Sequence, residues 1–140
     1  MIIMSIDYGD ARTGIAVCDQ MEMLASPVEV IHSDYEPKVI ARIKELSALY
    51  KPDLFVVGLP KNMNSSVGER AEKCMLFGEN LKKETGIETV MWDERLTTVS
   101  AHNYLNQTNT RGKKRKNVVD AVAATIILED YLSFRKNKFL

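Results

Sequence analysis

Four acidic residues stand where carboxylates could bind metal ions. Asp7 ends an apolar, β-rich run, and the pair Asp93-Glu94 follows an apolar run at residues 90–92. Asp120 lies in the first turn of a last segment that is apolar nearly all round. Carboxylates that meet in a partly buried site repel one another unless a cation neutralises them. Their hard oxygen donors suit Mg²⁺ or Mn²⁺, and two such ions about 4 Å apart can activate a water and stabilise the leaving oxygen of a phosphodiester.

Each of these acids also has a structural explanation when it is taken alone. Asp7 could begin a turn, and Asp120 could be a first-turn acid that complements a helix dipole. The pair Asp93-Glu94 could be a solvated strand end. The types and spacing of the residues therefore support a metal-site hypothesis and leave a structural role open for each acid.

A basic cluster immediately precedes Asp120. The chain has 19 Lys+Arg and 19 Asp+Glu, but residues 1–94 carry a net charge of −6 and residues 95–140 a net charge of +6. Charge asymmetry between halves is a better guide to partners than the total, so the neutral total does not exclude a polyanionic substrate. The alternative is an ordinary exposed, charged loop. The cluster consists of Arg111, Lys113, Lys114, Arg115 and Lys116.

The hydrophobic pattern predicts the scaffold that must position these residues. Short β-rich or continuous apolar runs predict strands, and apolar residues at helical spacing predict helices. The order β-β-β-α-β-α-β-α-α predicts an α/β fold whose mixed sheet is antiparallel at first, parallel afterwards and covered by helices. The expected strands cover residues 2–8, 15–18, 28–32, 54–57 and 88–92, and the expected helices cover 36–50, about 69–85, 97 or 98 to 105, and 118 to about 134.

Local signals predict the ends of several elements. Ser66 and Glu69 fit a capping box that opens the second helix, and Gly86 suits the residue just after its end. Residues 106–117 are expected to form a polar basic loop, with Asn117 as the N-cap of the last helix. The polar stretch at residues 7–14 predicts a hairpin with a longer loop between the first two strands.

The composition indicates one soluble globular domain, residues 1–140. The chain is 45% hydrophobic and 27% charged, and its length suffices for a stable core without disulfide bonds or structural metal ions. Its apolar runs are far shorter than the roughly 20 residues that a membrane span needs. The first four residues lack the features of a signal peptide, so we expect no membrane association and a cytoplasmic location. Cys18 and Cys74 match no disulfide framework or metal spacing and are expected to be buried.

Several motifs along the chain together resemble the YqgF/RuvX family. The match spans essentially the whole chain, in order and at the expected spacing. The resemblance implies an RNase H-like fold, with a five-stranded mixed sheet in the order 3-2-1-4-5 flanked by helices, and a nuclease that depends on Mg²⁺ or Mn²⁺. The family is described as Holliday-junction resolvases and as nucleases that mature the 5′ end of pre-16S ribosomal RNA. The motifs are Asp7-Tyr8-Gly9 with Arg12 and Gly14-Ile15-Ala16-Val17, Val57-Gly58-Leu59-Pro60, Asp93-Glu94-Arg95-Leu96-Thr97-Thr98, and Asp120-Ala121-Val122-Ala123-Ala124.

By this resemblance, the acids take distinct roles as catalytic metal ligands. Asp7 would be the ligand from the first strand, and Asp120 the ligand from the last helix. Asp93 or Glu94 would be the second acid. Only one of these two should bind metal directly, because successive strand residues point to opposite faces of a sheet. The sequence does not choose between them.

Basic and amide side chains near these acids are candidates for binding nucleic-acid phosphates. Neutralised phosphates make the affinity strongly dependent on salt. The loop that follows residues 57–60 carries Asn64-Ser65 where the family usually has an Asp-Gly pair, so the shape of this loop stays open. The candidate phosphate ligands are Arg12, Lys61, Asn62, Arg95, Arg111, Lys113, Lys114, Arg115 and Lys116.

The sequence is compatible with several functions. Processing of the 5′ end of pre-16S ribosomal RNA is the favoured one, with Holliday-junction resolution in DNA repair as the alternative. Symmetric junction cleavage needs two sites related by a twofold axis, and we expect a monomer or a weak dimer. A catalytically inactive nucleic-acid-binding module is an alternative of another class, although all acid positions are occupied. A nucleotide-binding phosphotransferase is disfavoured, because 140 residues leave no room for a second phosphate loop and domain.

Overall fold

The structure is a computed structural model that describes residues 1–60, 68–93 and 112–138. Within the last helix, side chains are described from Val122 to Asn137. No helix in these ranges is long and apolar enough to cross a membrane. The strands are β1 (Ile3–Tyr8), β2 (Arg12–Cys18), β3 (Ala25–His32), β4 (Leu54–Leu59) and β5 (Glu88–Asp93), and the helices are α1 (Glu36–Tyr50), α2 (Glu69–Thr85) and α4 (Gly112–Lys138).

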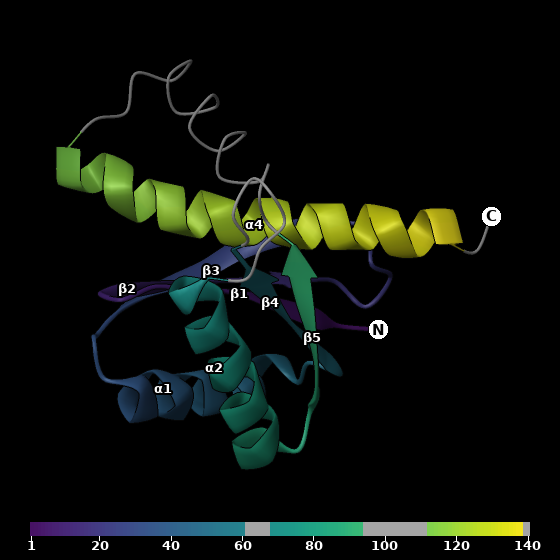
Figure 1. The fold of residues 1–140 in the computed structure, drawn as a ribbon. Helices are drawn as coiled ribbons and strands as arrows, with labels where there is room; N and C mark the ends of the chain where they lie inside the picture. Colours follow the sequence, from purple (N-terminus) through teal and green to yellow (C-terminus); the bar gives the residue numbers. More distant parts are fainter. Residues whose placement is uncertain (61–67, 94–111, 139–140) are drawn as a thin grey trace.

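The strands form one mixed sheet in the order β3-β2-β1-β4-β5. β2 pairs antiparallel with both β1 and β3, whereas β4 pairs parallel with both β1 and β5. The order and the strand directions confirm the predicted fold (Figure 1). Because β1, β4 and β5 run parallel, their carboxyl ends lie at one edge of the sheet, where open α/β sheets usually bind ligands.

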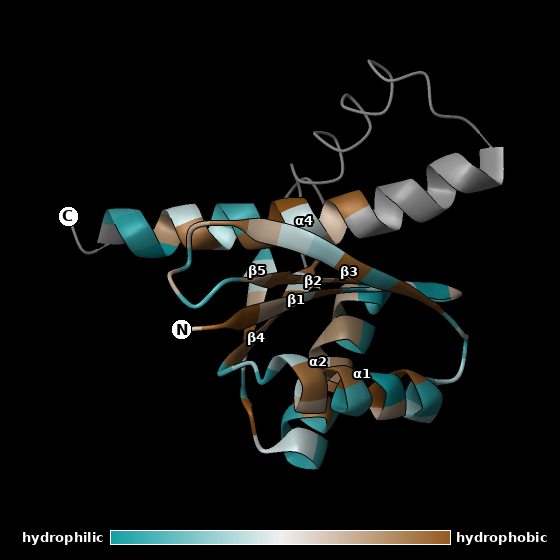
Figure 2. Ribbon diagram, turned by 180° about the vertical axis from the view of Figure 1, so that it is seen from behind, coloured by the Kyte–Doolittle hydropathy of each residue, from teal (hydrophilic) through white to brown (hydrophobic). Residues whose placement is uncertain are grey.

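Helices cover both faces of the sheet, with α1 and α2 on one face and α4 on the other (Figure 1). Along β1, Met4 and Ile6 join the apolar cluster under α1 and α2, whereas Ile3 joins the cluster under α4. This alternation is the pleat of the strand. Figure 2 shows hydrophobic residues along the strands between the two helical layers. Both predicted buried cysteines, Cys18 and Cys74, are confirmed.

Helix α4 runs antiparallel to β1 across its face of the sheet. The Ser5 hydroxyl donates a 2.6 Å hydrogen bond to the carbonyl oxygen of Ala124. Near the start of β1, the guanidinium of Arg135 pairs with Glu22 at 2.6 Å, and the same carboxylate binds the amino group of Met1 at 3.0 Å. The hydrogen bond from Arg135 is the main cause of the lowered pKa of Glu22. Residues of α4 that precede Ala124 therefore lie toward the carboxyl end of β1 (Figure 1).

Helix α4 is longer than the sequence predicts. It begins at Gly112, so the expected loop at residues 106–117 is wrong for 112–117, and so is the expected N-cap at Asn117. Polarity favours a loop in this stretch, but Lys and Arg are good helix formers, and the apolar part of the helix is anchored on the sheet. The helix ends at Lys138, beyond the expected end near Phe134. The helix predicted from 97 or 98 to 105 lies outside the described residues.

Helix α1 covers residues 36–50 as predicted, and α2 ends at Thr85 as predicted. Gly86 follows α2 with a φ of 72°, a conformation that glycine adopts without steric cost. The predicted capping box is wrong, because the N-cap is Gly68, which has no side chain to cap the helix. The proposed cap residue, Ser66, lies outside the described residues.

The first hairpin has a shorter loop than the sequence predicts. β2 begins at Arg12, so only Gly9–Ala11 separate it from β1. A polar Arg-Thr-Gly start gives no apolar strand signal, yet Thr13 is fully buried in the pairing. β3 likewise begins at Ala25 and includes Pro27. That proline is tolerated because β3 is an edge strand and its pairing with β2 is irregular nearby.

Candidate active site

Asp7 lies at the carboxyl end of β1, on the face of the sheet that packs against α4. Two residues earlier on the same face, Ser5 contacts the backbone of α4 at Ala124. Asp7 pairs with Gly14 of β2 and is half-buried. The predicted position of Asp7 at the end of the first strand is confirmed, and the strand pleat directs it toward α4.

Position 120 of α4 lies in the same direction as Asp7 from the contact between Ser5 and Ala124. From the contact between Ser5 and Ala124, position 120 is four residues back along the helix, about 6 Å at 1.5 Å per residue. Asp7 is two residues forward along β1, about 6–7 Å. Because α4 and β1 are antiparallel, both steps go in the same direction. The backbone therefore places positions 7 and 120 on the same side of the Ser5–Ala124 contact, toward the carboxyl end of β1, while the side chain of Asp120 lies outside the described part.

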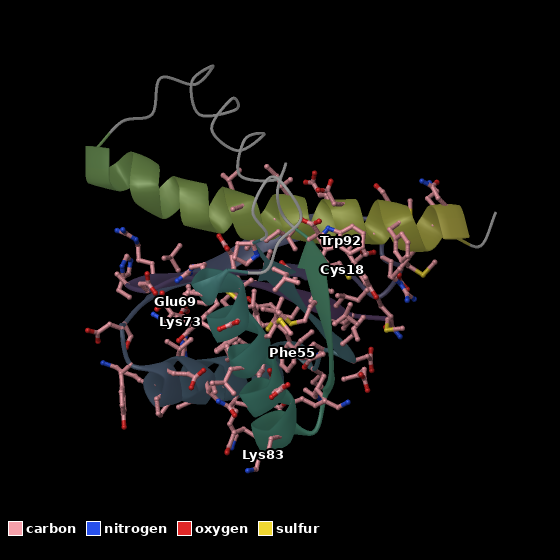
Figure 3. The ribbon with its side chains drawn as sticks, viewed as in Figure 1. Cys18, Phe55, Glu69, Lys73, Lys83 and Trp92 are labelled. Carbon is pink, nitrogen blue, oxygen red and sulfur yellow. The ribbon has the colours of Figure 1, made fainter. Side chains whose placement is uncertain are left out.

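Asp93 lies on the opposite face of the sheet from Asp7. On β5, Val90 and Trp92 pack with the α4 cluster, whereas Met91 packs with the α1 and α2 cluster. Asp93 is two residues after Met91, so the pleat places it on the α2 face. Figure 3 shows Trp92 where β5 approaches α4. Asp93 and Asp7 are thus at the same sheet edge but on different faces, and Glu94 lies outside the described residues.

The turn between β1 and β2 is held tightly beside this edge. The ring of Tyr8 stacks on Phe77 of α2 with the centroids 4.0 Å apart and the planes at 7°. Burial of the Tyr8 hydroxyl is the main cause of its raised pKa. Arg70 of α2 donates hydrogen bonds to the carbonyl oxygen of Tyr8 and, at 2.6 Å, to the Asp10 carboxylate.

The sequence gives only a weak signal for Arg70. A basic residue in the first turn of a helix opposes the helix dipole, and this is a reason to look for a specific partner. Its partners are about 60 residues away in sequence, and no local pattern links them. An open pocket of about 340 Å³ lies beside it, lined by Asp10, Glu69, Arg70 and Lys73. Figure 3 shows two of these residues, Glu69 and Lys73, at the start of α2.

The described side chains include few of the predicted phosphate ligands. Arg12 starts β2, opposite His32 of β3, and is half-buried. Residues 113–116 lie in the first turns of α4, where the structure describes the backbone alone. These predictions therefore stay predictions. The candidates outside the described residues are Lys61, Asn62, Arg95 and Arg111, together with the variant loop pair Asn64-Ser65.

The described side chains do not by themselves make up a metal centre. Among them, no group of three or more His, Cys, Asp or Glu side chains could hold a metal ion. Asp7 is the one proposed ligand with a described side chain on the α4 face, and its half-buried carboxylate is a hard oxygen donor that fits Mg²⁺ or Mn²⁺. The proposed ligands Glu94 and Asp120 have side chains outside the described part.

Replacing Gly9 with alanine should destabilise the protein. A Cβ at this position would lie 2.2 Å from the carbonyl oxygen of Arg12, so the turn would have to open. We expect Gly9→Ala to lower the free energy of unfolding by about 1–3 kcal/mol in urea titrations. Gly78→Ala is the control, because the nearest atom there belongs to the flexible side chain of Met91. Equal stability of wild type and Gly9→Ala would contradict this expectation.

A central strand that ends in an acid, in a mixed sheet of this order with helices on both faces, defines a domain of the RNase H-like class. The RuvX family model, described as Holliday junction resolvase, matches residues 1–134. The chain belongs to this family. This membership confirms the predicted class of activity, a nuclease that hydrolyses phosphodiester bonds.

Relatives and solved structures agree with this assignment. A protein of Agathobacter rectalis, provisionally named pre-16S rRNA nuclease, is 43% identical over 140 residues and covers 98% of each chain. A protein of Clostridium novyi with the same name is 42% identical over 132 residues, covering 94% of this chain and 98% of its own. RuvC of T. thermophilus in complex with a Holliday junction substrate has a TM-score of 0.62 at 13% identity, covering 98% of this chain and 96% of its own. The fowlpox virus Holliday junction resolvase has a TM-score of 0.57 at 14% identity, covering 96% and 99%. These two structures support the fold.

Proposed function

We propose that this chain is a metal-dependent nuclease that processes the 5′ end of pre-16S ribosomal RNA. The observation that supports the metal-dependent chemistry is the hydrogen bond between Ser5 and Ala124, because Asp7 on β1 and position 120 on α4 both follow from it in the same direction. The choice of an RNA precursor is supported by the names of relatives that are about as long as this chain and 43% or 42% identical to it.

In this proposal, Asp7, Glu94 and Asp120 hold Mg²⁺ or Mn²⁺. Glu94 is preferred to Asp93 because it follows Asp93 directly, and a continued pleat would turn it to the α4 face that carries Asp7. When bound, the ions would activate a water and stabilise the leaving oxygen of the phosphodiester. The protein's part would be to hold the three carboxylates close together. Without a cation, neighbouring carboxylates repel one another and move apart or take up protons.

The basic residues around this site would neutralise the nucleic-acid backbone. Arg12 opens β2 beside the turn that follows Asp7, and residues 113–116 form early turns of α4, ahead of position 120. Such an arrangement would guide a phosphate backbone toward the carboxylates and would give an affinity that falls steeply with salt. Lys61, Asn62, Arg95 and Arg111 are further candidates for phosphate contacts.

The substrate is tested by comparing two nucleic acids with one preparation. We expect Mn²⁺-dependent shortening of a ribosomal-RNA precursor at its 5′ end, and little cleavage of a four-way DNA junction under the same conditions. The oligomeric state is measured alongside by sedimentation, with a monomer or weak dimer expected. An Asp7→Asn preparation purified in the same way controls for contaminating ribonucleases.

Two other outcomes would replace this proposal. Paired, symmetric incisions in the junction by a dimer, with an intact RNA precursor, would identify a Holliday-junction resolvase, because such cleavage needs two sites related by a twofold axis. Tight RNA binding without turnover in either Mg²⁺ or Mn²⁺ would identify an inactive binding module.

A further inference from the structure

The last two residues of β1 lie beyond the ladder that joins β1 to β4. The parallel register between these strands ends at Ile6, whereas the antiparallel pairing with β2 continues through Asp7 and Tyr8. Among the described strands, the segment that carries Asp7 is therefore paired on one side only. Backbone carbonyl groups at such a strand end need another partner.

Arg70 of α2 supplies a hydrogen-bond donor for the carbonyl group of Tyr8, which lies beyond the pairing of β1 with β4. Its guanidinium donates one hydrogen bond to the carbonyl oxygen of Tyr8 and another, of 2.6 Å, to the carboxylate of Asp10. Hydrogen bonds from a charged donor are roughly twice as strong as neutral ones. The rigid fork of the guanidinium also fixes both acceptors relative to each other. Arg70 thus ties the residue that follows Asp7, and the turn beyond it, to α2.

A second attachment secures the same segment. Phe77, one of the fully buried residues of α2, stacks on the ring of Tyr8. Arg70 and Phe77 lie seven residues apart, two turns of helix, so α2 holds Tyr8 at its backbone and at its ring. The backbone contact is the one that bears on Asp7, because the carbonyl group of Tyr8 belongs to the residue bonded directly to Asp7.

We propose that Arg70 is a positioning residue for the nuclease site. By fixing the backbone at Tyr8, it sets the direction in which the Asp7 carboxylate leaves the sheet toward α4. This inference rests on the proposed function, in which Asp7 is a metal ligand. In this proposal Arg70 acts through the backbone of Tyr8 and not by binding metal or substrate itself. Groups that orient metal ligands typically change metal affinity about 10–100-fold when they are removed.

The test is an isothermal calorimetric titration of Mn²⁺ into nucleic-acid-free protein, which measures the Mn²⁺ dissociation constant. We expect Arg70→Gln to raise the Mn²⁺ dissociation constant about tenfold or more. The Mn²⁺ concentration that half-saturates cleavage should rise in parallel, while the rate at saturating Mn²⁺ changes much less. Arg70→Lys keeps the positive charge but loses the paired N–H donors of the guanidinium. It should therefore raise the Mn²⁺ dissociation constant by less than Arg70→Gln does. A protein that has merely lost stability would not show this split between half-saturation and maximal rate.

Arg42→Gln is the matched control. Arg42 is exposed to a similar extent, 41% against 38% for Arg70, and makes a comparable charged pair with Glu29 at 2.7 Å. It lies on α1 and has no contact with the turn that follows Asp7 among the interactions described. Arg42→Gln should therefore keep the Mn²⁺ affinity of the wild type. Thermal melting without metal reports on the fold of every variant.

The outcomes separate the two proposals. Normal Mn²⁺ affinity in Arg70→Gln, or an equal loss in Arg42→Gln, would overturn the positioning role of Arg70. If Arg70→Gln does not fold, unchanged affinity in Arg70→Lys has the same meaning. An Asp7→Asn variant that binds Mn²⁺ like the wild type would overturn the proposed function and this inference with it. A defective Asp7→Asn beside a normal Arg70→Gln would overturn the role of Arg70 alone.

Discussion

Asp7→Asn should abolish Mn²⁺-dependent cleavage while leaving nucleic-acid binding intact. Asparagine has the shape of aspartate but lacks the negative charge and one of the two carboxylate oxygens. If the carboxylate holds a metal ion, its loss removes several kcal/mol of transition-state stabilisation. About 4 kcal/mol corresponds to about a thousandfold in rate. The measurement is the single-turnover rate of cleavage of a ribosomal-RNA precursor at saturating protein.

The position of Asp7 explains why binding and folding should survive this change. The side chain is half-buried at a strand end, so an isosteric amide leaves no cavity. If the proposed carboxylates converge, removing one of them also relieves repulsion in the metal-free protein. We therefore expect a melting temperature without metal that is equal to or above that of the wild type. The further stabilisation that added Mn²⁺ gives to the wild type should be reduced or absent in the variant.

Two controls decide how the result is interpreted. Binding of the same RNA is measured by anisotropy without divalent metal. Wild type and Asp7→Asn should agree within about twofold, since the proposed phosphate ligands are other residues. Cleavage by both proteins at equal rates, from clean preparations, would remove Asp7 from the mechanism. Loss of binding together with loss of cleavage would instead show that Asp7 supports the RNA-binding surface.

The fold was largely predictable because its signals are local. The helix at 36–50 has apolar residues at regular helical spacing, and Gly86 provides an end signal for α2. The apolar run at 54–57 identifies a strand that is buried on both faces. The strand order required more than periodicity, and the family resemblance supplied it correctly.

The errors occur where a tertiary contact decides the structure. The basic stretch at 112–117 continues a helix whose apolar part is fixed on the sheet. Arg12 joins β2 because it pairs with His32 of β3. Pro27 is tolerated because its strand lies at the edge of the sheet. In each case the local composition favours a loop or a strand end. The contact that overrides it joins residues distant in sequence.

For the candidate site, the sequence supplies the residue types as a prediction but not their geometry. The acids were identifiable because each interrupts or ends an apolar segment. The partner of the strand end, Arg70, was not identifiable, because its contact with Tyr8 spans 62 residues. The choice between Asp93 and Glu94 depends on the phase of the β5 pleat, which is set by the packing of Met91 and Trp92 on opposite faces.

The phase of the β5 pleat leads to the second large effect on the cleavage rate that we expect. Glu94→Gln should lower the cleavage rate by about a hundredfold to a thousandfold, whereas Asp93→Asn should lower it by less than about tenfold. The two substitutions are chemically equivalent, since each exchanges one carboxylate for its amide at adjacent positions. Their difference therefore reports which of the two carboxylates reaches the metal site. Single-turnover cleavage and Mn²⁺ calorimetry are compared for both variants.

The packing of β5 gives the physical reason for this difference. Met91 contacts α2 closely enough that a Cβ on Gly78 would lie 2.9 Å from its sulfur, and Thr89 lies on the same side. Asp93 continues this row on the α2 face, so its carboxylate would have to cross the sheet to reach Asp7. A shift of the strand by one residue would move the apolar side chains of β5 to the wrong faces. A larger loss of cleavage rate in Asp93→Asn than in Glu94→Gln would show that the alternation of faces along β5 does not continue after Trp92 and that Asp93 is the ligand.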